Sequence, residues 1–405
     1  MTGGVSDGTA KVWARLDGEG KARVAWSTDP TFASDVHYTG YLDAVEESDY
    51  TLHFPIFGLT PETTYHYQVL IGNQLLASSS PNSFTTFASA GTNTNFEFVV
   101  FADALCPVPA PVMEYAAALG PSFMLQIGDL DHRDPYREAG LDIEAWREMH
   151  RSCLGTGGHG IDWATWLLPT VPLFHMWDDH DYGEDDTDKT EPFRRIATTA
   201  FREYFPTPEF PSPDDGLWYS FRHGQAEVFM LDLRSQRDPN ALPDSPSKSM
   251  LEGGGGDQQT WLQDGLLAST ATWKFIVSTS SWNPAAKRRD SWYRFPDEQA
   301  ELQNFIDGNG ITGVVILSAD AHTGGAIDDG TNAHYPEMSI PTTNVGGGCT
   351  APSCGAWSVG VEDEFSHKGF AQVSISYDPT SGVHSCLLRT RNEIGRTTLS
   401  LLLTE

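Results

Sequence analysis

The chain has 405 residues, of which 39% are hydrophobic and 11% aromatic, so it can bury sizeable cores and is not an intrinsically disordered protein. It carries 25 Lys and Arg residues against 55 Asp and Glu residues, a formal net charge of −30. This charge argues against a stable nucleic-acid partner and against binding to anionic membranes, because both polyanions would be repelled. An anionic substrate would therefore need local positive charge, which bound metal ions can supply.

The length suggests two or three domains. No apolar run approaches the roughly 20 residues that a membrane-crossing helix needs, so no transmembrane segment is expected. The first residues, MTGGVSDGTAKVWARL, lack the basic and then apolar pattern of a signal peptide. The oligomeric state cannot be predicted from these features.

The first ninety residues predict an all-β domain, residues 1–90. Short alternating or aromatic-rich runs are separated by Gly, Pro and Asp turns, at residues 10–16, 22–28, 51–59, 64–72 and 83–89. Regular short strands of this kind are typical of a β-sandwich of the fibronectin type III sort. The small, polar segment 88–95 (ASAGTNTN) then predicts a linker to a second domain, residues 91–405.

The pattern changes after the linker to six apolar runs that each end in polar, mostly charged residues. They are FEFVVFAD, SFMLQIGDLDH, PLFHMWDDHD, AEVFMLDLR, WKFIVSTSS and GVVILSADAH. Near-continuous apolar strands predict a sheet that is covered on both faces. Helix-compatible stretches lie between them, at residues 110–119, 141–150, 193–205, 257–269 and 297–308. This alternation predicts an α/β domain, with further strands at residues 370–377, 385–391 and 397–403.

The strand ends carry the chemistry of this domain. In open α/β sheets the ligand lies beyond the carboxyl ends of the strands, so side chains placed there are expected to converge. Carboxylates and imidazoles without thiolates suit hard or borderline metal ions. A single strand-end Asp is usually a cap or turn residue, but several strands ending this way favour a metal site. The strand-end residues are Asp103; Asp129, Asp131 and His132; Asp178, Asp179, His180 and Asp181; Asp232 and Arg234; Asp320 and His322.

The order of these motifs resembles the metallophosphatase (calcineurin-like) superfamily, and within it the PhoD-like alkaline phosphatases. The resemblance rests on Asp103, then Gly128-Asp129, then Asp178-Asp179-His180-Asp181, then Asp320-Ala321-His322, together with LDLR and the β-rich N-terminal region. It spans nearly the whole chain. It implies an α/β sandwich of two β-sheets flanked by helices, and a secreted or periplasmic location.

The resemblance also implies a site for two metal ions, of the Fe/Ca or Zn/Mn type. Asp129 would bridge the two ions. Asp103, His132 and His322 would complete one site, and Asp179 and Asp320 the other. The related proteins have a tyrosine where this chain has His132, which leaves open that His132 is a solvent-facing loop residue. Asp103 is favoured over the nearby Cys106, which we expect to be a buried bystander.

The implied function is hydrolysis of a phosphate ester, with a metal-activated hydroxide attacking phosphorus in line. His180 is expected to protonate the leaving group, and Asp181 to hold the His180 tautomer. Arg234 is expected to pair with a phosphoryl oxygen, with a salt bridge to a neighbouring acid as the alternative.

Three other functions remain open: a phospholipase D-like diesterase of the same fold, a non-catalytic, metal-stabilised binding protein, and a metal-dependent hydrolase of a non-phosphorus bond. The cysteines give less information. Cys349 and Cys354 bracket a short loop and could form a disulfide, and the odd total of five leaves at least one free thiol.

Overall fold

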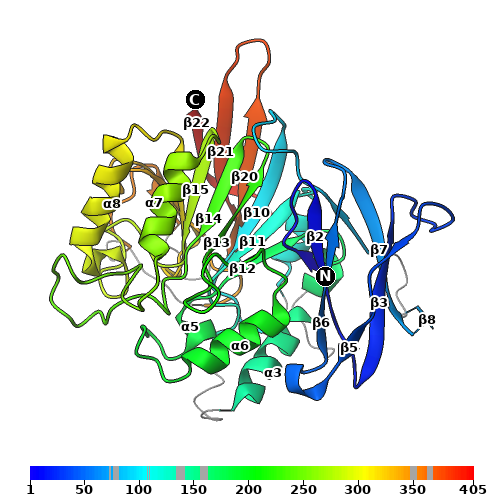
Figure 1. Ribbon diagram of the computed structural model, residues 1–405. Helices are drawn as coiled ribbons and strands as arrows, with labels where there is room; N and C mark the ends of the chain where they lie inside the picture. The colour runs from blue at the N-terminus through cyan, green and yellow to red at the C-terminus, as the bar shows by residue number, and fades with distance from the viewer. Residues whose placement is uncertain are drawn as a thin grey trace.

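The computed structural model describes residues 1–405 except 73, 76–81, 107, 109, 134–141, 156–162, 347–353 and 363–367. Two small sheets form the N-terminal part (Figure 1). The first has the order β1 (Thr2–Gly3), β2 (Thr9–Arg15), β6 (Thr51–Phe57). The second has the order β4 (His37–Tyr38), β3 (Gly20–Ser27), β7 (Thr64–Ile71), β8 (Gln74–Leu75), with β5 (Leu42–Ala44) paired to β3 and β9 (Asn82–Thr85) paired to β7.

Two larger sheets form the rest of the chain. One has the order β12 (Leu173–Met176), β11 (Phe123–Ile127), β10 (Phe96–Phe101), β20 (Gly369–Tyr377), β21 (His384–Asn392), β22 (Thr397–Thr404). Strands β10, β11 and β12 are parallel, and β20 joins β10 in antiparallel fashion. The C-terminal strands predicted from the sequence therefore extend the sheet that begins after the linker.

The other large sheet has seven strands. Their order is β13 (Tyr219–His223), β14 (Ala226–Met230), β15 (Trp273–Ser278), β16 (Val314–Ser318), β18 (Pro336–Ser339), β17 (Ala326–Asp329), β19 (Gly360–Val361). Strands β14, β15, β16 and β18 are parallel. Their carboxyl ends consequently lie at one edge of the sheet.

Helices cover the outer faces of the two large sheets (Figure 1). They are α1 (Val112–Ala117), α3 (Ile143–Leu154), α4 (Trp163–Trp166), α5 (Asp179–Tyr182), α6 (Arg194–Tyr204), α7 (Gln258–Ala268) and α8 (Pro296–Gly308), with short 3-10 turns η1 (Glu46–Ser48) and η2 (Trp292–Arg294). Because successive strand residues point to opposite faces, β15 uses both of its faces. Phe275 packs edge-on against Phe98 of the other sheet, at 5.3 Å between ring centroids. Ile276 packs with Leu262 of α7 and Leu302 of α8.

This two-sided burial explains why the six runs are apolar nearly throughout, and it confirms the prediction of two sheets flanked by helices. All six runs form strands, and the five helix-compatible stretches coincide with α1, α3, α6, α7 and α8. The predicted domain boundary near residue 90 stays a prediction. Within the described residues, no helix combines the length and the apolar character needed to cross a bilayer.

Candidate metal centre

The strand ends of both large sheets meet at one place. Asp103 follows β10, Asp129 follows β11, Asp179 begins α5 after β12, and Asp320 follows β16. Asp103, Asp129 and Asp320 have positive φ angles of 50°, 53° and 64°. Non-glycine residues adopt this conformation uncommonly, and such strain clusters at functional sites. These tight turns let a carboxylate project beyond the strand into the shared space.

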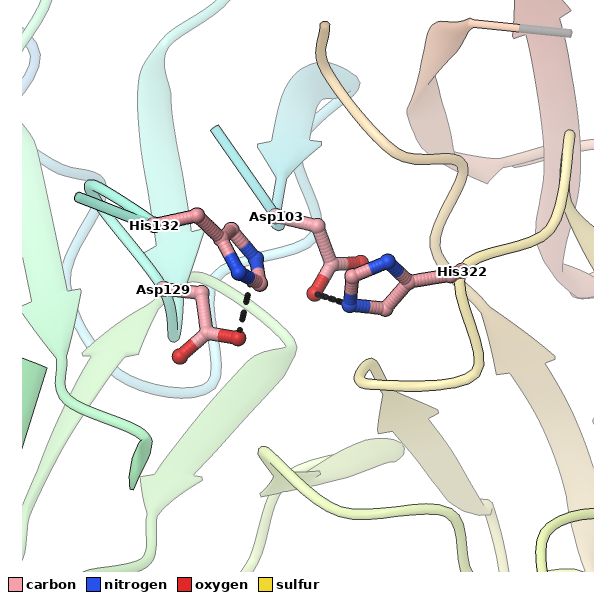
Figure 2. A group of neighbouring side chains, drawn as sticks. All are labelled: Asp103, Asp129, His132 and His322. Atoms are coloured by element: carbon pink, nitrogen blue, oxygen red, sulfur yellow. Dashed lines mark ion pairs between the residues drawn. The ribbon is translucent and has the colours of Figure 1, made fainter. Parts of the chain in front are cut away.

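Four of the predicted ligands form one group, which we call the histidine-rich group: Asp103, Asp129, His132 and His322 (Figure 2). Each offers one ligand atom, and these atoms all lie within 4.8 Å of one another. His132 Nε2 lies 3.1 Å from Asp129 Oδ2, and His322 Nε2 lies 3.6 Å from Asp103 Oδ1. His132 thus points into the group, as expected for a ligand and unlike a solvent-facing loop residue.

A second group, the carboxylate group, consists of Asp129, Asp178, Asp179 and Asp320, again with ligand atoms within 4.8 Å of one another. All four residues are buried. Asp129 belongs to both groups, which is the arrangement that a bridging carboxylate requires. The structure therefore brings together all six of the ligands predicted from the sequence.

The burial of these carboxylates favours the binding of cations. Asp103 Oδ2 and Asp320 Oδ2 are buried and accept no hydrogen bond from any described residue. Burial, reinforced by Asp129, raises the pKa of Asp103 to about 8. Burial also raises the pKa of Asp320 well above its usual value, against the opposing effect of Lys287. Buried carboxylates are retained when they are paired or coordinate metals, and this donor set suits divalent or trivalent ions.

His180 lies beside the histidine-rich group. Its ring centroid is 4.1 Å from that of His132, and its Nε2 is 3.8 Å from Asp185 Oδ1. Its backbone N–H donates to Asp129 Oδ1 and Asp179 Oδ1, at 3.2 and 3.1 Å. The ring forms part of the wall of a cavity of about 350 Å³, which Lys287, Asp320 and His322 also line. His180 is therefore placed to meet a molecule in this cavity.

Asp181 lies where it supports the loops rather than the His180 ring. Its carboxylate accepts hydrogen bonds from the backbone N–H of Leu130, at 2.8 Å, and of Asp178, at 3.0 Å. These bonds join the turn after β11 to the start of α5, and so fix Asp129 relative to Asp179. Asp185 lies beside the His180 ring, although it was not predicted for this role from the sequence, and carboxylate oxygens of Asp129 and Asp179 also lie within 4.8 Å of a ring nitrogen of His180.

The expectation for Arg234 has to be corrected. Its side chain is fully buried, donates to both oxygens of Asp178 and lies 2.8 Å from Asp290 Oδ2. It does not line the cavity. The alternative, a salt bridge to neighbouring acids, is what the structure has, because two buried carboxylates at this position require a positive partner.

Two cations do line the cavity, Lys287 and Arg289, and neither was predicted as a site residue from the sequence. Lys287 Nζ lies 2.5 Å from Asp320 Oδ1. The available signal was local charge: residues 287–294 (KRRDSWYR) contain four basic residues in a chain of net charge −30. The same segment supplies Asp290, which pairs with both Arg234 and Arg237.

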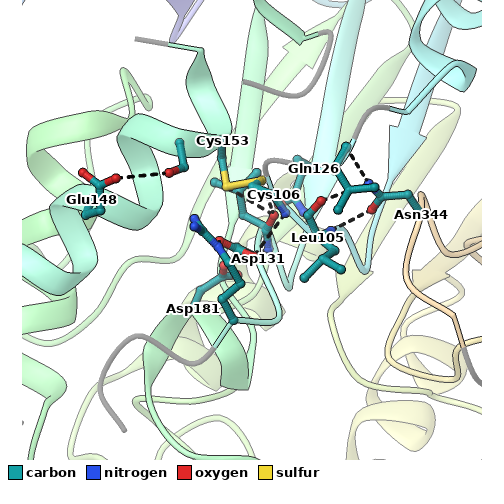
Figure 3. Close-up of a disulfide and its surroundings, with 12 residues drawn as sticks. Leu105, Cys106, Gln126, Asp131, Glu148, Cys153, Asp181 and Asn344 are labelled. Carbon is teal, nitrogen blue, oxygen red and sulfur yellow. Dashed lines mark hydrogen bonds and ion pairs between the residues drawn. A yellow bond between two sulfur atoms is a disulfide. The ribbon is translucent and has the colours of Figure 1, made fainter. Parts of the chain in front are cut away.

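A disulfide braces the turn that follows Asp103 (Figure 3). Cys106 and Cys153 are bonded, with 5.2 Å between their Cα atoms, across 47 residues of chain. Cys106 is buried, as expected, but it is a structural cross-link to α3 and not a bystander. The Cys106 N–H donates to Asp131 at 3.1 Å, which ties the neighbouring turn to the same brace. Cys386 is buried and free, and Cys349 lies outside the described residues.

Two sheets packed face to face, with carboxylates and imidazoles at their strand ends, define a protein of the metallophosphatase-like α/β class. Among solved structures, this chain is similar to the structure of PhoD, with a TM-score of 0.76 and 18% sequence identity. The alignment covers 99% of this chain and 88% of the PhoD chain. The chain is also similar to purple acid phosphatase PPD1 from yellow lupin (Lupinus luteus) seeds, with a TM-score of 0.68 and 14% sequence identity. This alignment covers 99% of this chain and 72% of the lupin chain. At these identities the likeness concerns the fold.

The sequence carries the family assignment. The family described as PhoD-like phosphatase matches residues 160–363, and the PhoD-like phosphatase N-terminal domain matches residues 1–87. The chain belongs to the PhoD-like phosphatase family. Alkaline phosphatase D of Bacillus subtilis (strain 168) is 28% identical over 183 residues, an alignment that covers 37% of this chain and 31% of that protein. The aligned part is thus less than a third of the length of this relative.

Proposed function

We propose that the protein is a metal-dependent phosphoester hydrolase, acting as a phosphomonoesterase, a phosphodiesterase or both. The observation that carries the proposal is the pair of ligand groups that share Asp129 at one cavity of about 350 Å³. The family assignment and the relatives named alkaline phosphatase D and purple acid phosphatase support the same chemistry.

In this proposal Asp103, Asp129, His132 and His322 hold one metal ion, and Asp129, Asp179 and Asp320 hold the other. Asp178 is less available, because its oxygens already accept from Arg234 and Thr279. Two ions bound in this way would activate water for attack on phosphorus and neutralise the phosphoryl oxygens. We propose ions of the Fe/Ca or Zn/Mn type, since the donors are carboxylates and imidazoles.

Two other side chains of the cavity act on the substrate itself. His180 Nε2 donates a proton to the leaving alkoxide oxygen, which departs as the alcohol, with Asp185 orienting the ring. Lys287 takes the role that the sequence analysis gave to Arg234, presenting positive charge to the phosphoryl group at the edge of the carboxylate group.

The proposal extends to the N-terminal part and to the location of the protein. The two small N-terminal sheets form a fibronectin type III-like sandwich that supports the catalytic domain. The Cys106–Cys153 disulfide favours an oxidising compartment, in line with a secreted or periplasmic enzyme.

The test is the initial rate on p-nitrophenyl phosphate and bis-p-nitrophenyl phosphate, before and after chelation and after metal add-back. We expect a rate on at least one ester that chelation abolishes and metal restores. The ratio of the two rates then gives the preference for monoesters or diesters. Failure of both esters with every metal tried would overturn the proposed function.

A further inference from the structure

A second, larger cavity adjoins the metal centre. It measures about 890 Å³, and Arg289 stands in the wall of both cavities. We call it the proline-lined groove, since Pro239, Pro243, Pro284 and Pro296 form much of its surface. The metal-centre cavity, at about 350 Å³, lies at the small end of the range for ligand pockets, so a substrate with a bulky alcohol arm would extend beyond it.

The groove adjoins the His180 side of the metal centre. Arg289 Nε lies 2.7 Å from Asp186 Oδ2, and an Arg289 terminal nitrogen lies 3.2 Å from Asp185 Oδ2. Asp185 lies beside His180 Nε2, and the Asp186 N–H donates to Asp179 Oδ2 at 2.7 Å. An alcohol that forms by proton transfer from His180 would therefore leave towards this wall.

The lining of the groove combines exposed apolar side chains with equal numbers of acidic and basic residues. Two large apolar side chains of the lining are exposed to solvent: Leu242 is 47% exposed and Tyr293 is 41% exposed. Three acids face three bases in the lining: Asp186, Asp188 and Asp244 against Lys248, Arg289 and Arg294. This balance leaves the lining without a net charge that would attract a second anion, whereas the exposed apolar side chains favour a neutral apolar group.

Tyr293 adds a preference for flat groups. The guanidinium carbons of Arg288 and Arg294 lie 5.6 and 6.0 Å from its ring centroid, so arginines hold the exposed ring in place. A fixed tyrosine ring beside proline surfaces suits a planar aromatic partner, which stacks without ordering flexible chains.

We propose that the proline-lined groove binds the leaving alcohol of the substrate, and that this alcohol is neutral and planar aromatic. The proposal rests on the proposed function and specifies its substrate class. Tyr293 and Leu242 are then specificity-determining residues: they contact the alcohol arm and not the phosphoryl group.

The experiment compares two phosphonates, whose carbon–phosphorus bond resists hydrolysis: naphthylmethylphosphonate, with a two-ring arm, and methylphosphonate, without one. Their dissociation constants are measured by calorimetry on the metal-loaded protein. We expect the two-ring compound to bind about tenfold or more tightly than methylphosphonate, as for other apolar pockets. Tyr293→Ala and Leu242→Ala are each expected to remove most of this difference.

The matched control is Tyr38→Ala, which removes another exposed tyrosine that stacks with an arginine, here Arg23 at 4.3 Å in the N-terminal part. It should keep the full preference for the two-ring compound. Equal binding of both phosphonates by the unaltered protein, or a preference that survives both groove substitutions, would overturn the proposal. A groove-dependent preference in a protein that hydrolyses neither p-nitrophenyl ester would instead support the groove and overturn the proposed function.

Discussion

At the scale of single residues, burial and charge decide which side chains can reach a substrate. Arg234 and Lys287 are both cations close to the carboxylate group, but only Lys287 lines the cavity. Arg234 is enclosed because Asp178 and Asp290 are themselves fully buried and need a charge partner. The sequence places Arg234 correctly at a strand end, but it does not show that Asp290, 56 residues later, lies on the other side of its guanidinium.

His180 allows a test of proton donation separate from metal binding. Because its ring lies beside the ligand groups, His180→Gln should keep bound metal and lower kcat by about 10²–10⁴-fold. The loss should be largest for esters with poor leaving groups, whose alkoxides need the proton most. A series of aryl and alkyl phosphates of increasing leaving-group pKa measures this slope. An equal loss across the series would argue against His180 as the proton donor.

At the scale of elements, the sequence predicts the strands of the large sheets better than their partners. Each of the six apolar runs is a strand because it is buried on both faces, a local pattern that the sequence records. The pairing of β20 with β10 joins residues 369–377 to residues 96–101. No short stretch of the sequence indicates this pairing, because the two strands are far apart in the chain. The disulfide shows the same limit, since Cys106 and Cys153 are far apart in sequence and only the position of α3 brings them together.

One histidine at the junction of the N-terminal and catalytic parts should make stability depend on pH. His223 lies between Phe87 and Phe96, at 4.6 and 4.0 Å between ring centroids, and its Nδ1 accepts from the Ala88 N–H. Burial lowers the pKa of His223 to about 4. In the unfolded chain the pKa of His223 has the usual histidine value of 6.5. Between pH 6.5 and about pH 4 the unfolded chain therefore binds a proton at His223 that the folded chain does not bind.

The contribution of neutral His223 to the free energy of unfolding is therefore complete above about pH 6.5 and is lost as the pH falls to about 4. This contribution is on the order of 3 kcal/mol. His223→Gln should reduce the fall in the free energy of unfolding over this range, while other buried histidines keep the remainder. Denaturant unfolding at a series of pH values measures it. His37→Gln, at an exposed histidine, is the control, and an unchanged pH dependence in His223→Gln would refute the assignment.

At the scale of the whole molecule, the N-terminal sheets are joined to the catalytic part by buried and half-buried ion pairs. Asp49 pairs with Arg15 of β2 and with Arg151 of α3, at 2.7 and 2.8 Å. Arg147 of α3 pairs with Glu203 of α6, whose backbone carbonyl accepts from Trp13. The sequence predicts both parts of the molecule, but not this contact, because its partners are about 100 or more residues apart.

Most of the predicted site follows from the sequence, because its ligands lie at the carboxyl ends of strands, where ligands bind in α/β sheets. The sequence does not predict the cations that balance the charge of these ligands. Lys287, for example, lies in a loop, and no strand or helix pattern in the sequence predicts the path of that loop.

The most direct test of this account is the metal content of the purified protein and of Asp129→Ala, measured by mass spectrometry after dialysis. The account predicts two metal ions per chain in the unaltered protein and loss of both on Asp129→Ala, because Asp129 belongs to both ligand groups. His180→Gln serves as the control and should retain two. Retention of both ions in Asp129→Ala would contradict the shared carboxylate, and with it the proposed two-metal site.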